Sequence, residues 1–399
     1  MSLDENESEA ISNFRKYLRI PTVHPNINYD ECVAFLSNLG HSLGLSVRVI
    51  LPKPSKPVVV MTLLGINPEL PSLLLNSHMD VVPVERKFWK HDPFGAEMDD
   101  DGNIYGRGAQ DMKCVGIQYI EAIRRCLKNG QKFKRTIHLL YVPDEEVGGA
   151  DGMGAFIRMD EFKKLNIGCA LDESLPSSSE IFVLHYADRT KWHLDISCTG
   201  ITGHGSLVPD GTAAGKIRYI IDKFLDYRES EKIKLLENPN LTLGDVTTVN
   251  LMALEGGIQA NVIPSKLSAT FVLRIAVDVD LEKLRNMVQK WCEEAGEGVE
   301  FNETWVGKNQ SVTKLDVKNP WWISFKNTCD KMKLKLKTVV CPARSDSTYL
   351  REAGIPAFGF SPMNNTPTLL HDHDEFLNKK IFLNGIHIYS NIITNLANV

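Results

Sequence analysis

YVPDEEVGG, residues 141–149, is the stretch from which the fold can be worked out. An apolar run over residues 136–142, expected as a buried strand, leads directly into three consecutive acids and then two glycines. One interpretation is a solvated acidic loop. The other is a metal site with its own base, because strands of an α/β sheet deliver residues to a ligand crevice at their carboxyl ends.

The composition is that of an ordinary globular protein. The chain has 399 residues, of which 43% are hydrophobic and 24% are charged, and this length favours two domains. A net charge of −5 predicts no nucleic acid or anionic membrane as partner. No apolar run approaches the roughly 18 residues of a membrane span, and no secretory signal is visible, so we expect a cytoplasmic protein. The eight scattered cysteines form no CxxC pair, which disfavours a cysteine zinc site.

Hydrophobic periodicity predicts an α/β sheet interrupted by a second domain. Apolar runs at residues 58–63, 73–77 and 136–142 are typical of buried strands, and helical patterns lie between them. After about residue 188 the expected order becomes strand, helix, strand, strand, helix, strand, which is the ferredoxin-like plan. The larger pattern resumes at Pro320 with a predicted helix at 321–332.

Two of the strand-associated motifs contain candidate metal ligands. In NSHMDVVP, His78 and Asp80 are two residues apart, so a strand places both on one face, where one can bind a metal and the other can orient it. A surface His–Asp pair is the alternative. In GRGAQDMK, Asp111 lies where a long loop meets a helix. Its two oxygens can bridge two metal ions, although a plain helix cap is equally compatible with the pattern.

The remaining motifs supply further acids and histidines. In the opening stretch, Glu145 and Glu146 point in different directions, so one can bind metal while the other accepts a proton from water. ALDES adds Glu173 after another short strand, and LLHDHDEF adds His371 and His373, of which one is expected to be a ligand. Asp144 receives no role from the pattern.

Two further motifs do not support other chemistries. GHSLG at residues 40–44 has the spacing of a serine-hydrolase nucleophile elbow, but it ends a predicted helix rather than joining a strand to a helix. GTAAGK at residues 211–216 is one residue too short for a phosphate-binding loop and is followed by Ile217 instead of Ser or Thr.

The order H-x-D, G-R-G-x-x-D, D-E-E-x-G-G, L-D-E, H-D-H resembles the co-catalytic zinc family of aminoacylases, carboxypeptidases, dipeptidases and acetylornithine deacetylases. The resemblance covers essentially the whole chain, and GGIQANVIP and GFSPMNNTPTLLHDHDE are most similar to aminoacylases. It implies a zinc-peptidase-like α/β catalytic domain at residues 1–187 and 314–399. It also implies an inserted ferredoxin-like α+β lid and dimerisation domain at residues 188–313.

The resemblance also implies a metal site with two zinc ions. It assigns one ion to His78, Asp111 and Glu173. It assigns the other to Asp111, Glu146 and His371, with Asp111 as the bridge. Asp80 would orient His78, and Glu145 would be the general base. A cis peptide bond between Asp111 and Met112 is a further expectation.

Substrate contacts are expected from the inserted domain of a homodimer. His204 in TGITGHGS would polarise the scissile carbonyl from the partner subunit, and Asn261 and Arg274 would bind the substrate's carboxylate or carbonyl. Relatives commonly have A-x-T-D-x-R near the last helices, whereas this chain has Ala343-Arg-Ser-Asp-Ser-Thr348. Thr348 therefore replaces an arginine, which leaves substrate anchoring there open.

The implied activity is hydrolysis of N-acyl-L-amino acids to a carboxylate and a free L-amino acid. A metallo-dipeptidase, a carboxypeptidase or a deacetylase of a single metabolite is the alternative within the family. A catalytically silent scaffold is the alternative outside enzymes, but all five implied ligands and Glu145 are present in the chain.

Overall fold

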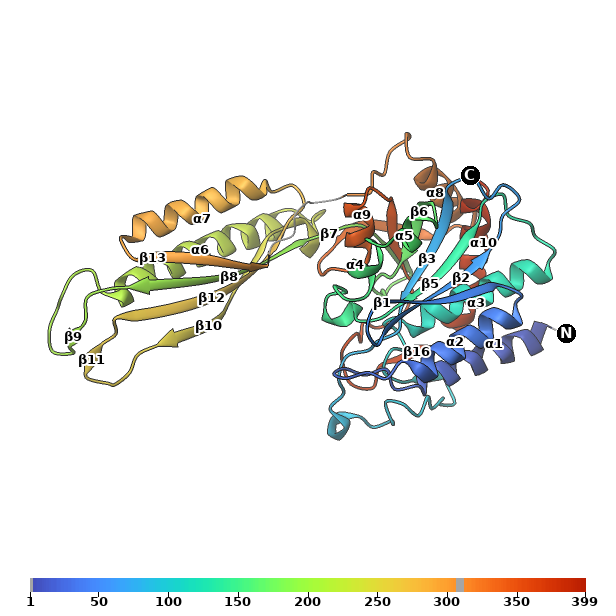
Figure 1. Cartoon of the computed structure of the whole chain (residues 1–399), viewed down its shortest axis with the longest axis horizontal. Coiled ribbons are helices and arrows are strands. Elements are labelled where there is room, and N and C mark those ends of the chain that lie inside the picture. The colour runs from blue at the N-terminus through green and yellow to red at the C-terminus, as the bar shows by residue number, and fades with distance from the viewer. Residues whose placement is uncertain (1–2, 306–311) are drawn as a thin grey trace. The chain divides into compact units, whose positions relative to one another are not determined.

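The structure is a computed structural model that describes residues 3–305 and 312–399. The chain divides into two compact units (Figure 1). The large unit comprises Met1–Tyr186, Val312–Thr338 and Ser345–Val399, and the small unit comprises Ala187–Ser311 and Val339–Arg344. Among the described residues, no helix is both long and apolar enough to cross a membrane.

A mixed sheet of eight strands forms the centre of the large unit. Strand β3 pairs in parallel with β5 and β6, and β15 continues the parallel part beside β6. The first two strands add antiparallel neighbours on the β5 side. The order is β1 (Ser46–Lys53), β2 (Lys56–Leu63), β5 (Ile137–Val142), β3 (Ser72–His78), β6 (Ile167–Asp172), β15 (Ala357–Phe360), β7 (Ile181–Asp188) and β14 (Lys335–Cys341).

Helices cover both faces of this sheet, as the strand–helix alternation predicts (Figure 1). Alternate residues of β2 show the division: Val59 and Met61 pack into one core cluster, and Val58 and Val60 into the other. The first cluster includes α1 (Leu3–Leu18), α2 (Asp30–Ser42), α3 (Lys113–Lys128), α8 (Pro320–Lys331) and α10 (Lys379–Leu396). The second includes α4 (Met153–Phe156), α5 (Asp160–Lys163) and α9 (Ser347–Glu352).

The small unit has the predicted ferredoxin-like plan. Its chain order is β8 (Thr190–Thr199), α6 (Ala213–Glu237), β10 (Thr248–Gly256), β12 (Lys266–Ile275), α7 (Leu281–Ala295) and β13 (Val299–Trp305). The four strands form an antiparallel sheet in the order β10-β12-β8-β13. Both helices pack on one face of it, where Leu194 and Phe271 meet Phe224 and Val288. The sequence pattern predicts that the last strand ends at Val306, which lies outside the described residues.

Short elements complete the fold. In the large unit these are η1 (Arg86–Phe88), η2 (Glu145–Val147) and the paired strands β4 (Asn103–Tyr105) and β16 (Phe376–Asn378). In the small unit they are η3 (Leu243–Asp245) and the paired strands β9 (Gly203–His204) and β11 (Val262–Ile263). The β4–β16 pair joins the long loop before α3 to the segment that contains the late histidines.

The helix-end interpretation of GHSLG is confirmed. Gly44 follows the end of α2 with a φ of 73°, and its N–H donates to the carbonyl of His41. A glycine with positive φ just beyond a helix is the usual C-terminal cap. Within the described part of the chain, Ser42 lies in α2 and no strand leads into it, so the serine is not presented as a nucleophile.

Candidate metal centre

Three parallel strands deliver His78, Glu173 and the acids after β5 to one edge of the sheet, whereas Asp111 and His371 come from loops. His78 ends β3 and is paired with Val142, the last residue of β5, and Glu173 follows directly after β6. Parallel strands end at the same edge, so His78, Glu173 and the acids after β5 lie together there. Along the chain these residues are separated by up to about a hundred positions, and the pairing of the strands brings them together.

Asp111 lies between two pairs of side chains, one on each of its oxygens. Its Oδ1 is 3.0 Å from His78 Nε2, and that nitrogen is 3.5 Å from Glu173 Oε2. Its Oδ2 is 3.3 Å from His371 Nε2, and that nitrogen is 3.0 Å from Glu146 Oε2. The five residues therefore form two triads that share one carboxylate, a geometry in which that carboxylate can bridge two ions.

Glu145 lies beside the first triad. One potential ligand atom from each of His78, Glu145 and Glu173 lies within 4.8 Å of the other two, and the same holds for His78, Asp111 and Glu146. The neighbouring acid Asp172 faces elsewhere, since its two oxygens accept hydrogen bonds from Asn76 and Ser347. Of the two acids in ALDES, Glu173 is the one that reaches the cluster.

A buried acid missed by the sequence reasoning holds the loop before Asp111. Glu375 is fully buried, accepts the backbone N–H groups of Gly108 and Gln110 at 3.1 and 2.6 Å, and pairs with Arg107 at 2.8 Å. Burial raises the pKa of Glu375 to about 7, although the nearby Arg107 acts against this. Its sequence signal was its place at the end of LLHDHDEF, but its partners lie more than 260 positions earlier. The peptide bond between Asp111 and Met112 is cis, as expected.

Of the two late histidines, His371 is the one that converges on the cluster. It has a φ of 63°, and its side chain is about half exposed. The ring of His373 instead packs against Phe88, with 5.1 Å between ring centroids. The exposed face of His371 leaves the cluster open to solvent on that side.

The turn after β5 explains the two glycines of the opening stretch. Asp144, Gly148 and Gly149 have φ values of 64°, 99° and 66°, a conformation that favours glycine at the last two. A Cβ on Gly149 would lie 2.6 Å from Asp346 Oδ1, so this position also requires a residue without a side chain. The turn directs Glu145 and Glu146 back over the strand ends.

Asp80 makes different contacts from those the spacing suggests. His78 Nδ1 lies 2.9 Å from the backbone carbonyl of Asp80 and 3.7 Å from its carboxylate, so the carbonyl is the group that orients the ring. The Asp80 carboxylate instead accepts the backbone N–H groups of Glu145 and Glu146 at 3.1 and 3.0 Å. It is fully buried and fixes the backbone of both acids.

The acids of the cluster are crowded. Burial raises the pKa of Glu145 well above its ordinary value, and the charge of Glu173 adds to the effect. Burial likewise raises the pKa of Glu173 and of Glu146, and Asp111 is the main charge acting on each. These four carboxylates oppose one another's ionisation because they share a site removed from water.

The histidines compensate part of this charge. Burial alone would raise the pKa of Asp111, yet hydrogen bonds with His371 and His78 hold it far below its ordinary value. The same contact with Asp111, followed by that with Glu146, raises the pKa of His371 to about 10. Burial works against protonation of His78, but the charge of Glu173 and the contact with Asp111 still raise its pKa well above the ordinary value.

This donor set fits divalent metal ions. Carboxylates outnumber histidines in the cluster by two, and Glu146 Oε1 is buried with no hydrogen-bond partner among the described residues. Imidazole nitrogens and carboxylate oxygens without a thiolate are typical of catalytic zinc. The eight cysteines are buried and form no disulfide, and none belongs to the candidate groups found in the described chain.

The expected substrate-binding residues all belong to the small unit. His204 and Asn261 lie together at the β9–β11 pair, where the N–H of Gly205 donates to the carbonyl of Asn261. Arg274 lies near the other end of β12, half-buried opposite Thr248. Arg274 is eight positions beyond Lys266 along β12, which is roughly 26 Å of extended strand. Within one chain, Arg274 therefore lies at the opposite end of β12 from the β9–β11 pair, which contains His204.

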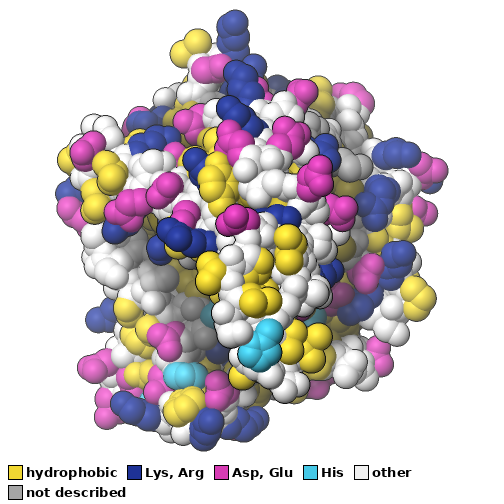
Figure 2. Space-filling view, turned by 90° about the vertical axis from the view of Figure 1, so that its left-hand side faces the viewer, with side chains coloured by type: hydrophobic (Ala, Val, Ile, Leu, Met, Phe, Trp, Pro, Cys, Tyr) yellow, Lys and Arg dark blue, Asp and Glu magenta, His cyan; other side chains and the backbone are white. Residues whose placement is uncertain are grey.

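The loops around β9 and β11 carry an exposed apolar surface. The side chains of Leu207, Val208 and Ile258 are 60%, 98% and 88% exposed. Seen from this side, apolar side chains gather beside an exposed histidine (Figure 2). Exposed apolar groups in such number are typical of a binding surface.

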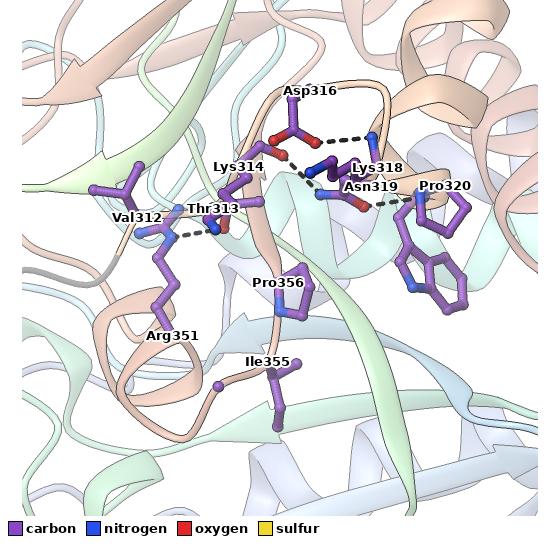
Figure 3. A pocket seen from close by; sticks show the side chains of 12 residues that line it. Val312, Thr313, Lys314, Asp316, Lys318, Asn319, Pro320, Arg351, Ile355 and Pro356 are labelled. Atoms are coloured by element: carbon purple, nitrogen blue, oxygen red, sulfur yellow. Dashed lines mark hydrogen bonds between the residues drawn. The ribbon is translucent and has the colours of Figure 1, made fainter.

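A cavity of about 540 Å³ in the large unit is separate from the cluster (Figure 3). Its lining includes Thr313, Asn319 and Pro356, and the Nε of Arg351 donates to Thr313 Oγ1 at 3.2 Å. Pro356 precedes β15, which runs parallel to β6, so this cavity is at the amino ends of these strands. None of the predicted site residues lines it.

The fold and the paired histidine–carboxylate triads define a metallohydrolase of the α/β peptidase type, and the chain belongs to Peptidase family M20/M25/M40, whose profile matches residues 74–395. Aminoacylase-1 from Sus scrofa is 49% identical to it over 397 residues, covering 99% of this chain and 97% of that protein. Aminoacylase-1 from Homo sapiens is 47% identical with the same coverage. The resemblance to aminoacylases is confirmed.

A solved structure shows the same fold. The M20 family metallo-carboxypeptidase from Sulfolobus solfataricus superimposes with a TM-score of 0.74 at 19% identity, covering 98% of this chain and 99% of that chain. At this identity the likeness concerns the fold alone.

Proposed function

We propose that this protein hydrolyses the amide bond of N-acyl-L-amino acids with two zinc ions held by the cluster at the sheet edge. The observation that carries the proposal is the position of Asp111, whose two oxygens face two different histidine–glutamate pairs with Glu145 alongside. The aminoacylases that share 47–49% of its residues support N-acyl amino acids as the substrate class.

The residues divide into two ligand sets. His78, Asp111 and Glu173 would hold one ion, and Asp111, Glu146 and His371 the other. Bound zinc would supply Lewis acidity and lower the pKa of a water molecule to about 7. The turn after β5, residues 144–149, is called the acid turn. Asp80 keeps its backbone in place by accepting two of its N–H groups.

Glu145 is the general base in this proposal. Its carboxylate accepts a proton from the attacking water, the water oxygen bonds to the amide carbonyl carbon, and the carbon–nitrogen bond then breaks. Glu145 returns the proton to the leaving nitrogen, which yields a carboxylate and a free amino acid. His204 would donate a hydrogen bond to the oxygen that becomes negative during attack.

The positions of His204 and Arg274 favour a homodimer. They lie roughly 26 Å or more apart along the small sheet, too far to contact one amino-acid-sized substrate from the same chain. If one chain supplies His204 and Asn261 and the other chain supplies Arg274, the small units act as lids and as the dimer interface. The exposed apolar loops around His204 suit such a contact. Buried cysteines that form no disulfide suit a reducing cytoplasm.

The test is turnover of N-acetyl-L-methionine by purified protein before and after removal of metal by a chelator, with a panel of dipeptides in parallel. We expect chelator-sensitive release of methionine that zinc restores, and slower dipeptide cleavage. A folded, zinc-loaded protein that cleaves dipeptides but no N-acyl amino acid would favour a peptidase instead. A protein that binds no zinc and turns over neither class would favour a scaffold.

A further inference from the structure

A second polar cluster contacts the turn that bears Glu145 and Glu146 through Asp80 and Asp144. His24 Nε2 is 2.8 Å from Asp80 Oδ2, Lys56 Nζ is 2.6 Å from Asp144 Oδ2, and the hydroxyl of Tyr29 donates to Asp144 Oδ1 at 3.0 Å. Both carboxylates are buried. Three of these five residues come from the segment between α1 and the start of β2, far from the acid turn in sequence.

This cluster is not a third metal site. His24, Asp80 and Asp144 do offer ligand atoms within 4.8 Å of one another. However, the ammonium of Lys56 already occupies the place of a cation on Asp144, and Asp80 already accepts three donors. The two carboxylates are matched by an ammonium and an imidazole, so the charge is balanced when His24 is protonated.

His24 is suited to carry that charge. Its hydrogen bond with Asp80 raises its pKa above the ordinary value, although partial burial opposes this. An ionised carboxylate can only accept, so His24 is the donor through Nε2–H. Its backbone N–H donates to the carbonyl of Val81, which anchors the histidine beside the Asp80 segment.

The turn that bears Glu145 and Glu146 is held from two directions by this cluster. Asp80 accepts the backbone N–H of each acid, at 3.1 and 3.0 Å. Asp144, with its positive φ, is tied at the side chain by Tyr29 and Lys56. Since the base and a metal ligand are adjacent on this turn, a shift of Asp80 is transmitted to both.

We propose that His24 is a positioning residue for the hydrolysis proposed above: by donating to Asp80, it fixes the peptide groups of Glu145 and Glu146. Lys56 and Tyr29 fix the same turn through Asp144. The inference rests on the proposed function for its catalytic consequence. Its structural consequence, the order of the turn, can be measured without any substrate.

The experiment compares His24→Ala, which removes the donor, with His24→Gln, whose side-chain amide can still donate to Asp80. His41→Ala is the matched control, since His41 is an exposed histidine on α2. Each zinc-loaded variant is assayed for kcat and KM on N-acetyl-L-methionine, for bound zinc by elemental analysis, and for thermal unfolding.

We expect His24→Ala to lower kcat by about 10- to 100-fold, the cost of a small misplacement of reacting groups, with KM changed less than about twofold. His24→Gln should recover most of the loss, and His41→Ala should match the wild type. Unchanged kcat in His24→Ala overturns the proposal. Equal losses in His24→Ala and His24→Gln overturn it too, because they show that the ring's packing, not its donor, is what matters.

A second readout separates this proposal from the proposed function. Hydrogen exchange of the segment at residues 143–149 should be about tenfold faster in His24→Ala than in the wild type, as expected for the loss of one charge-assisted hydrogen bond. Tyr29→Phe, a milder change, should also make hydrogen exchange of the same segment faster. If the wild type proves inactive on N-acyl amino acids, the proposed function fails while this test still applies. Unchanged exchange in both variants would contradict the role of the cluster.

Discussion

Acidification is expected to destabilise the large unit through a histidine buried in its sheet. His138 lies on β5 and is 5% exposed. Its Nδ1 is 2.9 Å from Thr62 Oγ1, and its Nε2 is 3.2 Å from the carbonyl of Leu165. The neutral ring with its proton on Nε2 satisfies both contacts, with Thr62 as donor and Leu165 as acceptor. Burial lowers the pKa of His138 to about 4.

The magnitude follows from the difference between the folded and unfolded pKa. An unfolded histidine titrates near 6.5, so below that pH the unfolded chain binds more protons than the folded one. The stability from the neutral His138 is therefore complete above about pH 6.5 and is lost as pH falls towards 4. At pH 5, preferential protonation of the unfolded chain lowers the folding equilibrium constant roughly 30-fold. This corresponds to about 2 kcal/mol of lost unfolding free energy.

The assay is urea unfolding of the chelator-treated protein from pH 8 to pH 5, for the wild type and His138→Gln. The stability advantage of the wild type over the variant should shrink by about 2 kcal/mol between these pH values, because glutamine does not titrate. His41→Gln, at an exposed site, should leave the profile unchanged. If the difference between wild type and His138→Gln is the same at every pH, the assignment of a buried neutral histidine is refuted.

Three further predictions concern the metal centre. Glu145→Gln should lower kcat by about 10²- to 10⁴-fold while bound zinc, measured by elemental analysis, stays unchanged; near-normal turnover would remove Glu145 as the base. Asp111→Asn should weaken both zinc sites in equilibrium dialysis, and retention of two tightly bound ions would contradict a bridging role. Gly149→Ala should lower kcat more than Gly148→Ala does, because its Cβ would lie 2.6 Å from Asp346 Oδ1, whereas a Cβ on Gly148 would meet no described residue within 4 Å apart from its chain neighbours. Equal kcat in the two alanine variants would show that this contact is easily relieved.

Hydrophobic pattern was sufficient for most of the fold. Strands β2, β3 and β5 and helix α8 lie within two residues of their predicted bounds, because a run of apolar residues with strand or helix spacing marks each of them. Two strands of the large sheet were missed. Strand β1 is a mostly exposed edge strand, so burial imposes little pattern on it, and β7 contains the buried His185, which interrupts its apolar run.

The candidate metal residues could be found from sequence because each follows a recognisable strand or helix boundary in a specific order. The residues that hold these metal ligands in position could not be found from sequence. Glu375 caps the loop before Asp111, and His24 and Lys56 fix the acid turn, yet each acts on partners more than fifty residues away. Such contacts depend on the tertiary fold and leave no local spacing. For the same reason, the role of Asp144 became clear only from its contacts with Lys56 and Tyr29.

Zinc-edge anomalous diffraction from crystals of the zinc-loaded protein tests the central claim most directly. We expect two peaks on either side of Asp111, each about 2.0–2.2 Å from one of its oxygens, one also bound by His78 and the other by His371. A single peak, or peaks that do not share Asp111, would contradict the bridged two-ion centre on which the proposed hydrolysis depends.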